Sequence, residues 1–341
     1  MLQNEYQVSL FDYLFDRSGY KRIDHFAEEV AAALYISRSG AYKKIRAISK
    51  LSFDESMQVC KYFGISLDQY LDSFGMEKSS YAFQSDDIVK PLTSYLQWAK
   101  NILTHSESMD RFRDEYTVYS FSNEIPVFHI LPFHHLLSFK LFVWNRNNWN
   151  ISQYGLKYDF DHFDKDTELK STLAEVNDHF ISYESVDVWG SDFLTNTLNQ
   201  LRYYTKIGAF RRQEDPLLIL ADIRKMINHL KSTAKAGAKM RFGSKETHAK
   251  MDIYLNYTHT SPELIFIQSG KNRVIYSSYL SPNYLRTTDE RICDYTNSWM
   301  EKAIAQSSLI SKVGEVDREN VFNFLMSILD DMEDKLRYYS R

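Results

Sequence analysis

The chain has 341 residues, 44% of them hydrophobic and 25% charged, with a formal net charge of −4, as in a globular protein of two or three domains. The high content of Tyr, Phe and Trp and the scarcity of Pro and Gly argue against long disordered connections. The two cysteines have no metal or redox spacing, the N-terminus is not leader-like and no apolar stretch approaches about 20 residues, which together predict a cytoplasmic protein and argue against a membrane-spanning one.

The first 75 residues predict a compact all-α domain made of five short helices. Apolar residues recur at helical spacing in VSLFDYLFD and again in IDHFAEEVAAAL, residues 23–34. Beyond a turn, Ser37 is a candidate N-cap for a helix from Arg38 to about Ile48. The inward face of that helix is predicted to hold Ala41, Ile45 and Ile48.

Two capping-box patterns predict the helices that complete this domain. Ser52 and Glu55 open one helix, which Gly64 would close. Ser66 and Gln69 open a shorter helix directly after it. Because each pattern satisfies free amide groups at a helix start, both positions are predicted helix boundaries.

A basic run stands out in a chain of net negative charge. Five basic side chains lie between residues 38 and 50 with no acidic residue among them: Arg38, Lys43, Lys44, Arg46 and Lys50. Like charges repel one another, and a phosphate backbone would offset that repulsion. The alternative interpretation is a basic helix face exposed to solvent, which is common in globular proteins.

Residues 23–71 resemble the helix-turn-helix of the λ-repressor-like, Xre-type transcription regulators, and ISRSGAYKKIRAISKLSFDESMQVCKYFGISLDQYL is similar to versions common in Bacteroidetes. The resemblance implies that FAEEVAAAL is the supporting helix, that residues 35–37 are the turn and that residues 38–48 are the recognition helix. It covers only about the first 75 residues. The family usually has glycine where this chain has Tyr35, and a tyrosine in a left-handed conformation costs on the order of 1 kcal/mol.

On a helix that begins near Arg38, seven side chains are predicted to contact double-stranded DNA. Those nearest the helix N-terminus are assigned to base edges in the major groove: Arg38, Ser39 and Tyr42. The remaining basic residues are assigned to backbone phosphates: Lys43, Lys44, Arg46 and Lys50. The sequence therefore predicts a sequence-specific DNA-binding transcription regulator.

Residues 76–87 are polar and rich in Ser and Asp, which predicts a linker, and residues 88–341 predict a larger mixed α/β region. Helices are predicted near 87–105, 133–147, 167–180, 191–207, 215–233, 288–306 and 317–338. Strands are predicted at 115–121, 125–131 and 183–189, followed by a short antiparallel β-meander of 251–257, 263–268 and 273–280. The fold class expected for the whole chain is α+β.

Two patterns could suggest a metal ion, but neither has the spacing that a metal site needs. His129, His134 and His135 offer imidazoles, yet adjacent histidines point in different directions, so core or partly buried histidines are expected. Residues 158–166, YDFDHFDKD, lack the glycine of a calcium loop and have Phe163 where Asp or Asn is required. An acidic surface turn is expected there, and no metal or cofactor is predicted.

Basic residues also gather in residues 231–245, KSTAKAGAKMRFGSK. Their spacing excludes a nucleotide-binding P-loop, and a flexible exposed loop is expected. The binding of a small anionic effector and a second contact with DNA are the alternatives. The chain has no nucleophile elbow, no H-E-x-x-H motif and no nuclease-like acidic strand, so no enzymatic activity is predicted.

The last predicted helix carries an apolar stripe: Val321, Leu325, Ile328, Met332 and Leu336. Such a stripe is either core or a dimer seam, and a helix-turn-helix that reads a two-fold operator needs a dimer. We therefore expect a homodimer whose C-terminal region senses a ligand or binds a protein partner. The alternatives are an enzyme that acts on nucleic acid or nucleotides and is targeted by the helix-turn-helix, and a protein-interaction platform.

Overall fold

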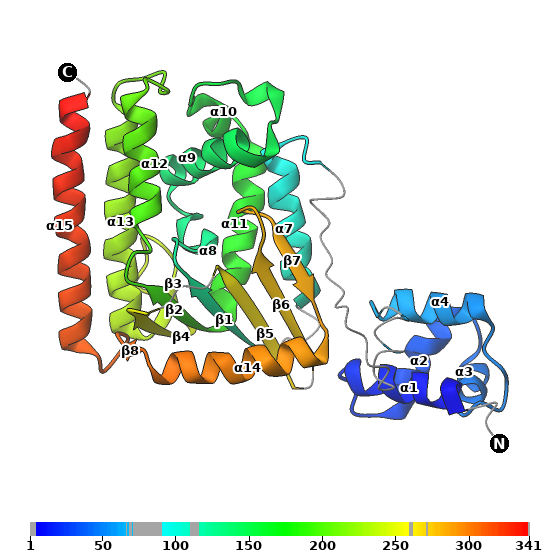
Figure 1. Ribbon diagram of the computed structural model, residues 1–341. Helices are drawn as coiled ribbons and strands as arrows, with labels where there is room; N and C mark the ends of the chain where they lie inside the picture. Colours follow the sequence, from blue (N-terminus) through cyan, green and yellow to red (C-terminus); the bar gives the residue numbers. More distant parts are fainter. Residues whose placement is uncertain are drawn as a thin grey trace. The chain divides into compact units, whose positions relative to one another are not determined.

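The computed structural model describes residues 5–65, 67, 70, 91–109, 116–258, 262–270 and 272–339. The chain divides into two compact units, residues 1–82 and 83–341 (Figure 1). Each unit has a hydrophobic core of its own. The predicted linker at 76–87 and the predicted capping box of Ser66 and Gln69 lie outside the described residues.

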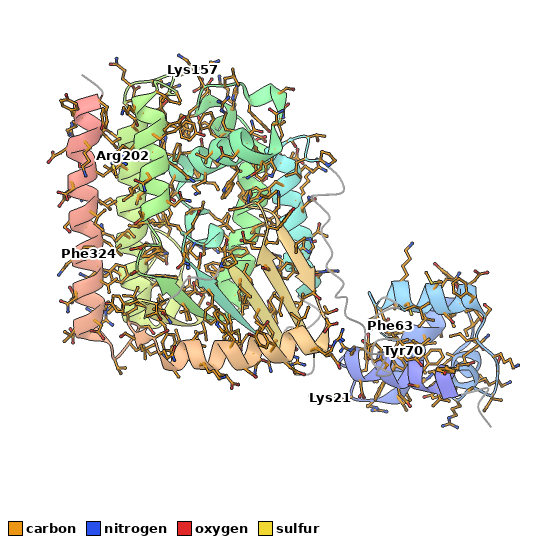
Figure 2. All side chains as sticks on the ribbon, viewed as in Figure 1. Lys21, Phe63, Tyr70, Lys157, Arg202 and Phe324 are labelled. Atoms are coloured by element: carbon orange, nitrogen blue, oxygen red, sulfur yellow. The ribbon has the colours of Figure 1, made fainter. Side chains whose placement is uncertain are left out.

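The first unit is α-helical throughout its described part. Its helices are α1 (Glu5–Arg17), α2 (Ile23–Leu34), α3 (Arg38–Ile45) and α4 (Phe53–Tyr62). The ring of Phe26 lies at the centre of the core, with its centroid 5.3 Å from those of Phe15 and Phe63 and 6.5 Å from that of Phe11. Phe63 and the buried Tyr70 are labelled in Figure 2. Aromatic contacts therefore join α1, α2 and the end of α4 within this core.

The predicted caps at Ser37, Ser52 and Gly64 are confirmed. The Oγ of Ser37 accepts a hydrogen bond from the amide of Gly40, at 3.1 Å, at the start of α3. Ser52 and Glu55 form a reciprocal capping box at the start of α4. Gly64 follows α4 with a φ of 68°. These local signals therefore place the start of α3 and both ends of α4.

α3 is shorter than predicted because a side chain of α1 binds the backbone that follows the helix. The Nε2 of Gln7 donates hydrogen bonds to the carbonyls of Lys44 and Ser49, at 2.7 and 2.8 Å. Its Oε1 accepts one from the amide of Leu51, at 2.9 Å. The helix ends before Ile48, whose side chain is 71% exposed. The predicted place of Ile48 on the inward face is therefore wrong.

The second unit is built on an eight-stranded mixed sheet, and the predicted antiparallel meander of 251–257, 263–268 and 273–280 is wrong at its first strand, which pairs in parallel with residues 185–190 and not with the next strand. The strands are β1 (Tyr116–Ser122), β2 (Glu184–Gly190), β3 (Ala238–Met240), β4 (Thr247–Asn256), β5 (Leu264–Ser269), β6 (Asn272–Ser278), β7 (Tyr284–Thr287) and β8 (Ser308–Leu309). Their order is β3-β4-β2-β1-β5-β6-β7, and β8 also pairs with β4. β1, β2 and β4 are parallel, because helical connections separate them along the chain, and only β5, β6 and β7 form a meander.

Helices connect and cover this sheet. They are α7 (Tyr95–Met109), α8 (Val127–Ile130), α9 (His134–Trp144), α10 (Asp161–Asp164), α11 (Thr167–Ser182), α12 (Thr195–Lys206), α13 (Asp215–Ala236), α14 (Glu290–Ala305) and α15 (Glu315–Tyr339), with a π-helical turn at Asn145–Trp149 and a 3₁₀ turn at Ser152–Tyr154. Residues 125–131 were predicted as a strand and instead contain α8. A short apolar run does not by itself distinguish a strand from a buried helical turn, and Pro126 lacks the amide that a strand needs. Within the described ranges, every helix is too short or too polar to cross a bilayer.

The sheet is buried on both faces. α14 packs against β4 and β6 on one face, where Phe121, Val188 and Phe266 form a separate apolar cluster. On the other face α11 and α13 pack against β4, and α15 packs against α13 and α12 (Figure 1). Successive side chains of a strand point to opposite faces of the sheet. A sheet that is covered on both faces therefore needs apolar side chains at consecutive positions of its strands.

The apolar stripe of α15 belongs to the core of its own unit. Four of its five residues are buried there: Val321, Leu325, Met332 and Leu336. Phe324, labelled in Figure 2, lies outside the stripe and is 59% exposed. The interpretation of the stripe as a dimer seam is therefore wrong, because α12 and α13 already cover it.

The predicted flexible exposed loop at residues 231–245 is wrong for most of the segment. α13 continues to Ala236 and β3 spans Ala238–Met240, and only residues 241–245 are a mostly exposed turn. Lys239 of β3 is fully buried, and its ammonium donates hydrogen bonds to the carbonyls of Phe180 and Tyr183, both at 2.7 Å. Two further basic residues form ion pairs: Lys231 with Glu319 and Arg241 with Asp178. We therefore do not place an anionic effector at this segment.

Lys239 should make the stability of the second unit depend on pH. Burial lowers the pKa of Lys239 to about 7, and the carboxylate of Asp187 only partly opposes this effect. An unfolded lysine has a pKa of about 10.4, so the unfolded state binds more protons between these values and stability rises with pH. We therefore compare the free energy of unfolding of the wild-type chain with that of Lys239→Met. The difference should rise in favour of the wild type by up to about 1.4 kcal/mol per pH unit from pH 7 to pH 9.

Urea unfolding of the full chain at pH 7, 8 and 9 measures this difference. Tryptophan fluorescence reports on the second unit alone, because all five tryptophans lie in it. Lys235→Met is the matched control, since Lys235 is exposed near the end of α13, and it should show no such trend. A difference between wild type and Lys239→Met that does not change with pH would contradict the lowered pKa.

Candidate nucleic-acid interface

A left-handed turn joins α2 to α3. Tyr35 has a φ of 54° and a ψ of 39°, and the amide of Ile36 bonds back to the carbonyl of Ala31 at 3.0 Å, which closes α2. The side chain of Tyr35 is 91% exposed. Sequence reasoning treated this tyrosine only as an unfavourable turn residue. Its exposed ring lies three residues before the start of α3, in the turn that leads into the predicted contact helix.

Five of the seven predicted contact residues lie on the solvent side of α3 and its C-cap. They are Arg38, Ser39, Tyr42, Lys43 and Arg46, of which only Tyr42 is half-buried. The opposite side of the helix buries Ala41 and Ile45 in the core. Because α3 itself has no acidic residue, its solvent side is positively charged.

Tyr42 orders the two arginines of this surface. The guanidinium carbons of Arg38 and Arg46 lie 6.0 and 5.8 Å from the centroid of its ring. Residues four apart stand one above another on a helix, so the three side chains form a row. A guanidinium held against an aromatic ring is already oriented, and it loses less freedom when it binds a phosphate or a base.

Arg38 is also paired with two carboxylates of α2. Its Nη1 lies 2.9 Å from Oε1 of Glu28, and its Nη2 lies 3.8 Å from Oδ2 of Asp24. The side chain of Arg38 is 48% exposed, and exposed ion pairs contribute only about 0.2–1 kcal/mol. Such a pair can be exchanged for a contact with DNA. The pairing of these two acids with Arg38 was not predicted from the sequence. Their one sequence signal is a spacing of four residues, which places both on one face of α2.

Lys44 has a structural role that the basic run does not reveal. Its ammonium lies 2.7 Å from Oε2 of Glu55 and donates a hydrogen bond to the carbonyl of Lys50 at 2.6 Å. The same Glu55 oxygen accepts the amide of Ser52 at 2.7 Å. Only 14% of the Lys44 side chain is exposed. We therefore remove Lys44 from the set of phosphate contacts, because its charge is neutralised inside the domain.

The other basic residues of the run keep their charges toward solvent. Lys43, Arg46 and Lys50 are exposed, and in the described part of the chain no carboxylate pairs with them. Burial opposes ionisation of Glu55, but the hydrogen bonds from Lys44 and Ser52 outweigh it and lower the pKa of this carboxyl. The Glu55 carboxyl therefore stays ionised at neutral pH.

The three histidines that could have suggested a metal make separate contacts. His129 is buried, and its Nε2 lies 2.7 Å from Oδ2 of Asp187. The ring of His135 stacks on Phe160 with the centroids 4.0 Å apart, whereas His134 is exposed rather than buried as expected. Among the residues with described positions, no three His, Cys, Asp or Glu side chains gather to hold a metal ion.

Residues 158–166 hold the short helix α10 and are more than an acidic turn. Part of this segment is buried, with Phe163 only 2% exposed. Its aspartates form ion pairs with a neighbouring segment: Asp159 with Arg211 and Asp161 with Arg212. These carboxylates are therefore engaged in holding two parts of the second unit together.

Comparison of the chain with known proteins found no relative. No family model, no curated protein and no solved structure matches the chain. The functional interpretation therefore depends on the residues of the chain and on their geometry.

Lys44 and Lys43 should differ in their effect on stability although they carry the same charge. Lys44→Ala leaves Glu55 and the carbonyl of Lys50 without their partner, and it should lower the local unfolding free energy of α3 and α4 by about 1–3 kcal/mol. Lys43→Ala, the matched control, should change it by less than about 0.5 kcal/mol. Amide hydrogen exchange of residues 38–62 in the full chain measures both, and equal protection in the two variants would contradict the structural role of Lys44.

Proposed function

We propose that this protein is a sequence-specific DNA-binding transcription regulator in which α3 enters the major groove. The observation that carries the proposal is the solvent side of α3: an acid-free helix, capped by Ser37 and following a left-handed turn, with two arginines ordered by Tyr42. A local basic surface on a chain of net negative charge is typical of a nucleic-acid reader.

The contact residues divide by their position on the helix. Residues near the N-terminus of a recognition helix reach deepest into the groove, so Arg38, Ser39 and Tyr42 are assigned to base edges, with Arg38 suited to guanine. Lys43, Arg46 and Lys50 are assigned to phosphates, which give affinity and register but no sequence information. These roles are the ones predicted from the sequence, except that Lys44 is no longer assigned to a phosphate.

A homodimer is part of the proposal. The eight residues of α3 span only about 12 Å, so one copy can read only a few base pairs. Two copies on a two-fold operator would give the specificity that a regulator needs. Because the stripe of α15 is covered within its own unit, the contact between copies must use another surface.

Selection from random duplex DNA with the full chain tests the function. Specific binding should enrich a motif with two related half-sites. Arg38→Ala should then cost about 1–3 kcal/mol on the selected site and relax its sequence preference, whereas Lys43→Ala should weaken all sequences alike and reduce the salt slope by about 1. The absence of any enriched motif, together with no binding to duplex DNA at low salt, would refute the proposal.

Glu28 should restrain DNA binding. Glu28→Gln removes the carboxylate that pairs with Arg38 and lowers the repulsion of nearby phosphates, so affinity for the selected site should rise by about two- to fivefold at low salt. Asp12→Asn makes the same charge change at an exposed site on α1 and should have a smaller effect. Fluorescence anisotropy titrations measure both variants, and weaker binding by Glu28→Gln would contradict an Arg38 that exchanges its partner for DNA.

A further inference from the structure

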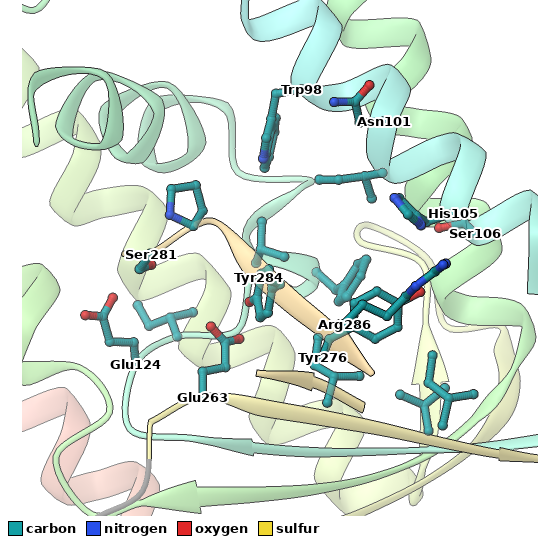
Figure 3. Close-up of a pocket in the computed structure, with 18 of the residues that line it drawn as sticks. Trp98, Asn101, His105, Ser106, Glu124, Glu263, Tyr276, Ser281, Tyr284 and Arg286 are labelled. Atoms are coloured by element: carbon teal, nitrogen blue, oxygen red, sulfur yellow. The ribbon is translucent and has the colours of Figure 1, made fainter. Parts of the chain in front are cut away.

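The second unit contains a cavity between the sheet and α7 (Figure 3). One wall is a face of α7 that carries Trp98, Asn101, Ile102 and His105, which are spaced three and four apart and so share one side of the helix. The opposite wall is the sheet, and Trp144 of α9 and the Ser281–Pro282 segment also line the cavity. Nothing in the sequence marks this site, because its walls come from distant segments.

The sheet wall follows from the alternation of side chains along the strands. Ile265 and Ile267 of β5 line the cavity, whereas Phe266 between them packs in the cluster under α14. Ile265 pairs with Tyr276 of β6, and Tyr276 pairs with Arg286 of β7. Ile265, Tyr276 and Arg286 all line the cavity. The pairing of the three strands therefore places an apolar, an aromatic and a cationic side chain next to one another.

One end of the cavity carries two carboxylates. Glu124 follows β1 and Glu263 precedes β5, and the antiparallel pairing of Phe121 with Leu264 brings these strand ends together. Figure 3 shows both carboxylates at the same end, with Arg286 and His105 on the other side of Tyr284. Ligands of sheets with parallel strands commonly bind at this carboxyl edge.

The two carboxylates have unequal partners. Glu124 lies 3.3 Å from the ammonium of the buried Lys140 and also accepts a hydrogen bond from Asn196. Lys140 in turn donates to Gln200 at 3.1 Å. Glu263 instead bonds to the phenol of Tyr284, which is a neutral donor. Among the residues that the structure describes, the acidic end therefore has two carboxylates and one buried ammonium, and that ammonium is shared with neutral acceptors.

Within the described ranges no cation forms an ion pair with Glu263, and the pKa of this carboxyl agrees with that arrangement. Burial and, to a smaller extent, the nearby Glu124 raise the pKa of Glu263 to about 7, although the phenol of Tyr284 and the ammonium of Lys140 oppose the shift. Burial also raises the pKa of Tyr284 well above its ordinary value, so this phenol stays neutral. A cation placed beside Glu263 would favour the ionised carboxylate.

We propose that this cavity binds a small monoamine whose cationic head contacts Glu263 and Tyr284 and whose apolar body packs against Trp98 and Trp144. The aromatic walls suit both parts of such a ligand, because aromatic rings bury apolar groups and attract cations. This inference does not depend on the proposed DNA binding, since every residue involved lies in the second unit.

The probes are two sets of matched compounds: 2-phenylethylamine, 2-phenylethanol and 3-phenylpropanoate, and hexylamine, hexanol and hexanoate. Titration of the full chain is followed by tryptophan fluorescence and calorimetry, since Trp98 and Trp144 line the cavity. At least one amine should bind about tenfold or more tightly than its alcohol and its carboxylate. Absence of binding by both amines, equal binding within a set, or preference for a carboxylate would each overturn the proposal.

A second measurement assigns the preference to Glu263. Glu263→Gln should lower amine affinity about tenfold and abolish the preference over the alcohol, while Glu175→Gln, an exposed control on α11, should change neither. Because only the ionised carboxylate attracts the amine, affinity in the wild-type chain should rise about tenfold from pH 6 to pH 8.

This pH profile is measured on the wild-type chain, so it tests the role of Glu263 even if Glu263→Gln fails to fold. In the described part of the chain, the charged and titratable groups that face Glu263 are Tyr284, Glu124 and Lys140. An amine affinity that stays constant from pH 6 to pH 8, or that survives in a folded Glu263→Gln chain, would refute the assignment.

Discussion

The surface that we propose to bind DNA depends on a group of polar contacts where α1, α3 and α4 meet. Gln7 binds the backbone on either side of the turn after α3, and Lys44 joins that turn to Glu55 of the capping box. A helix of eight residues is not stable alone, so its length and direction come from such contacts and from the core beneath it. One lysine of the basic run therefore stabilises the domain, and the remaining basic side chains point to solvent.

In the second unit, the comparable constraint is the satisfaction of buried charge. A buried cation is costly unless it is paired or fully hydrogen-bonded. Lys239 donates hydrogen bonds to two carbonyls and lies against two aromatic rings, yet burial still lowers its pKa to about 7. Arg318 donates to the carbonyls of Ile310 and Lys312, but among the described residues its Nε has no hydrogen-bond partner. Glu263 has a neutral phenol as its partner, and it lines a cavity that a ligand can enter. Its position at the cavity, more than its burial, singles out the acidic end as a binding site.

The local features of the chain could be predicted, and most of the misassignments come from distant contacts. The caps at Ser37 and Ser52 and the strands near 115–121 and 183–189 are confirmed. Ile48 and most of the segment 231–245 were misassigned because their positions depend on partners elsewhere in the chain. Gln7 bonds to the carbonyl of Lys44 at the end of α3, 37 residues away, and Lys239 bonds to a carbonyl 59 residues away. The strand at 125–131 was wrong for a local reason, because a short apolar run does not distinguish a strand from a helical turn.

The sequence by itself determined which segments are helices with defined ends, where a basic helix follows a turn, and that the chain mixes α and β structure. These properties arise from hydrogen bonds and side-chain spacings within about four residues, so they are readable from a short window. Only the tertiary structure decided that Lys44 faces Glu55, that the stripe of α15 is core, and that Glu124 and Glu263 meet at one end of a cavity. Each of these depends on strand order and helix packing, which bring together groups that no local pattern connects.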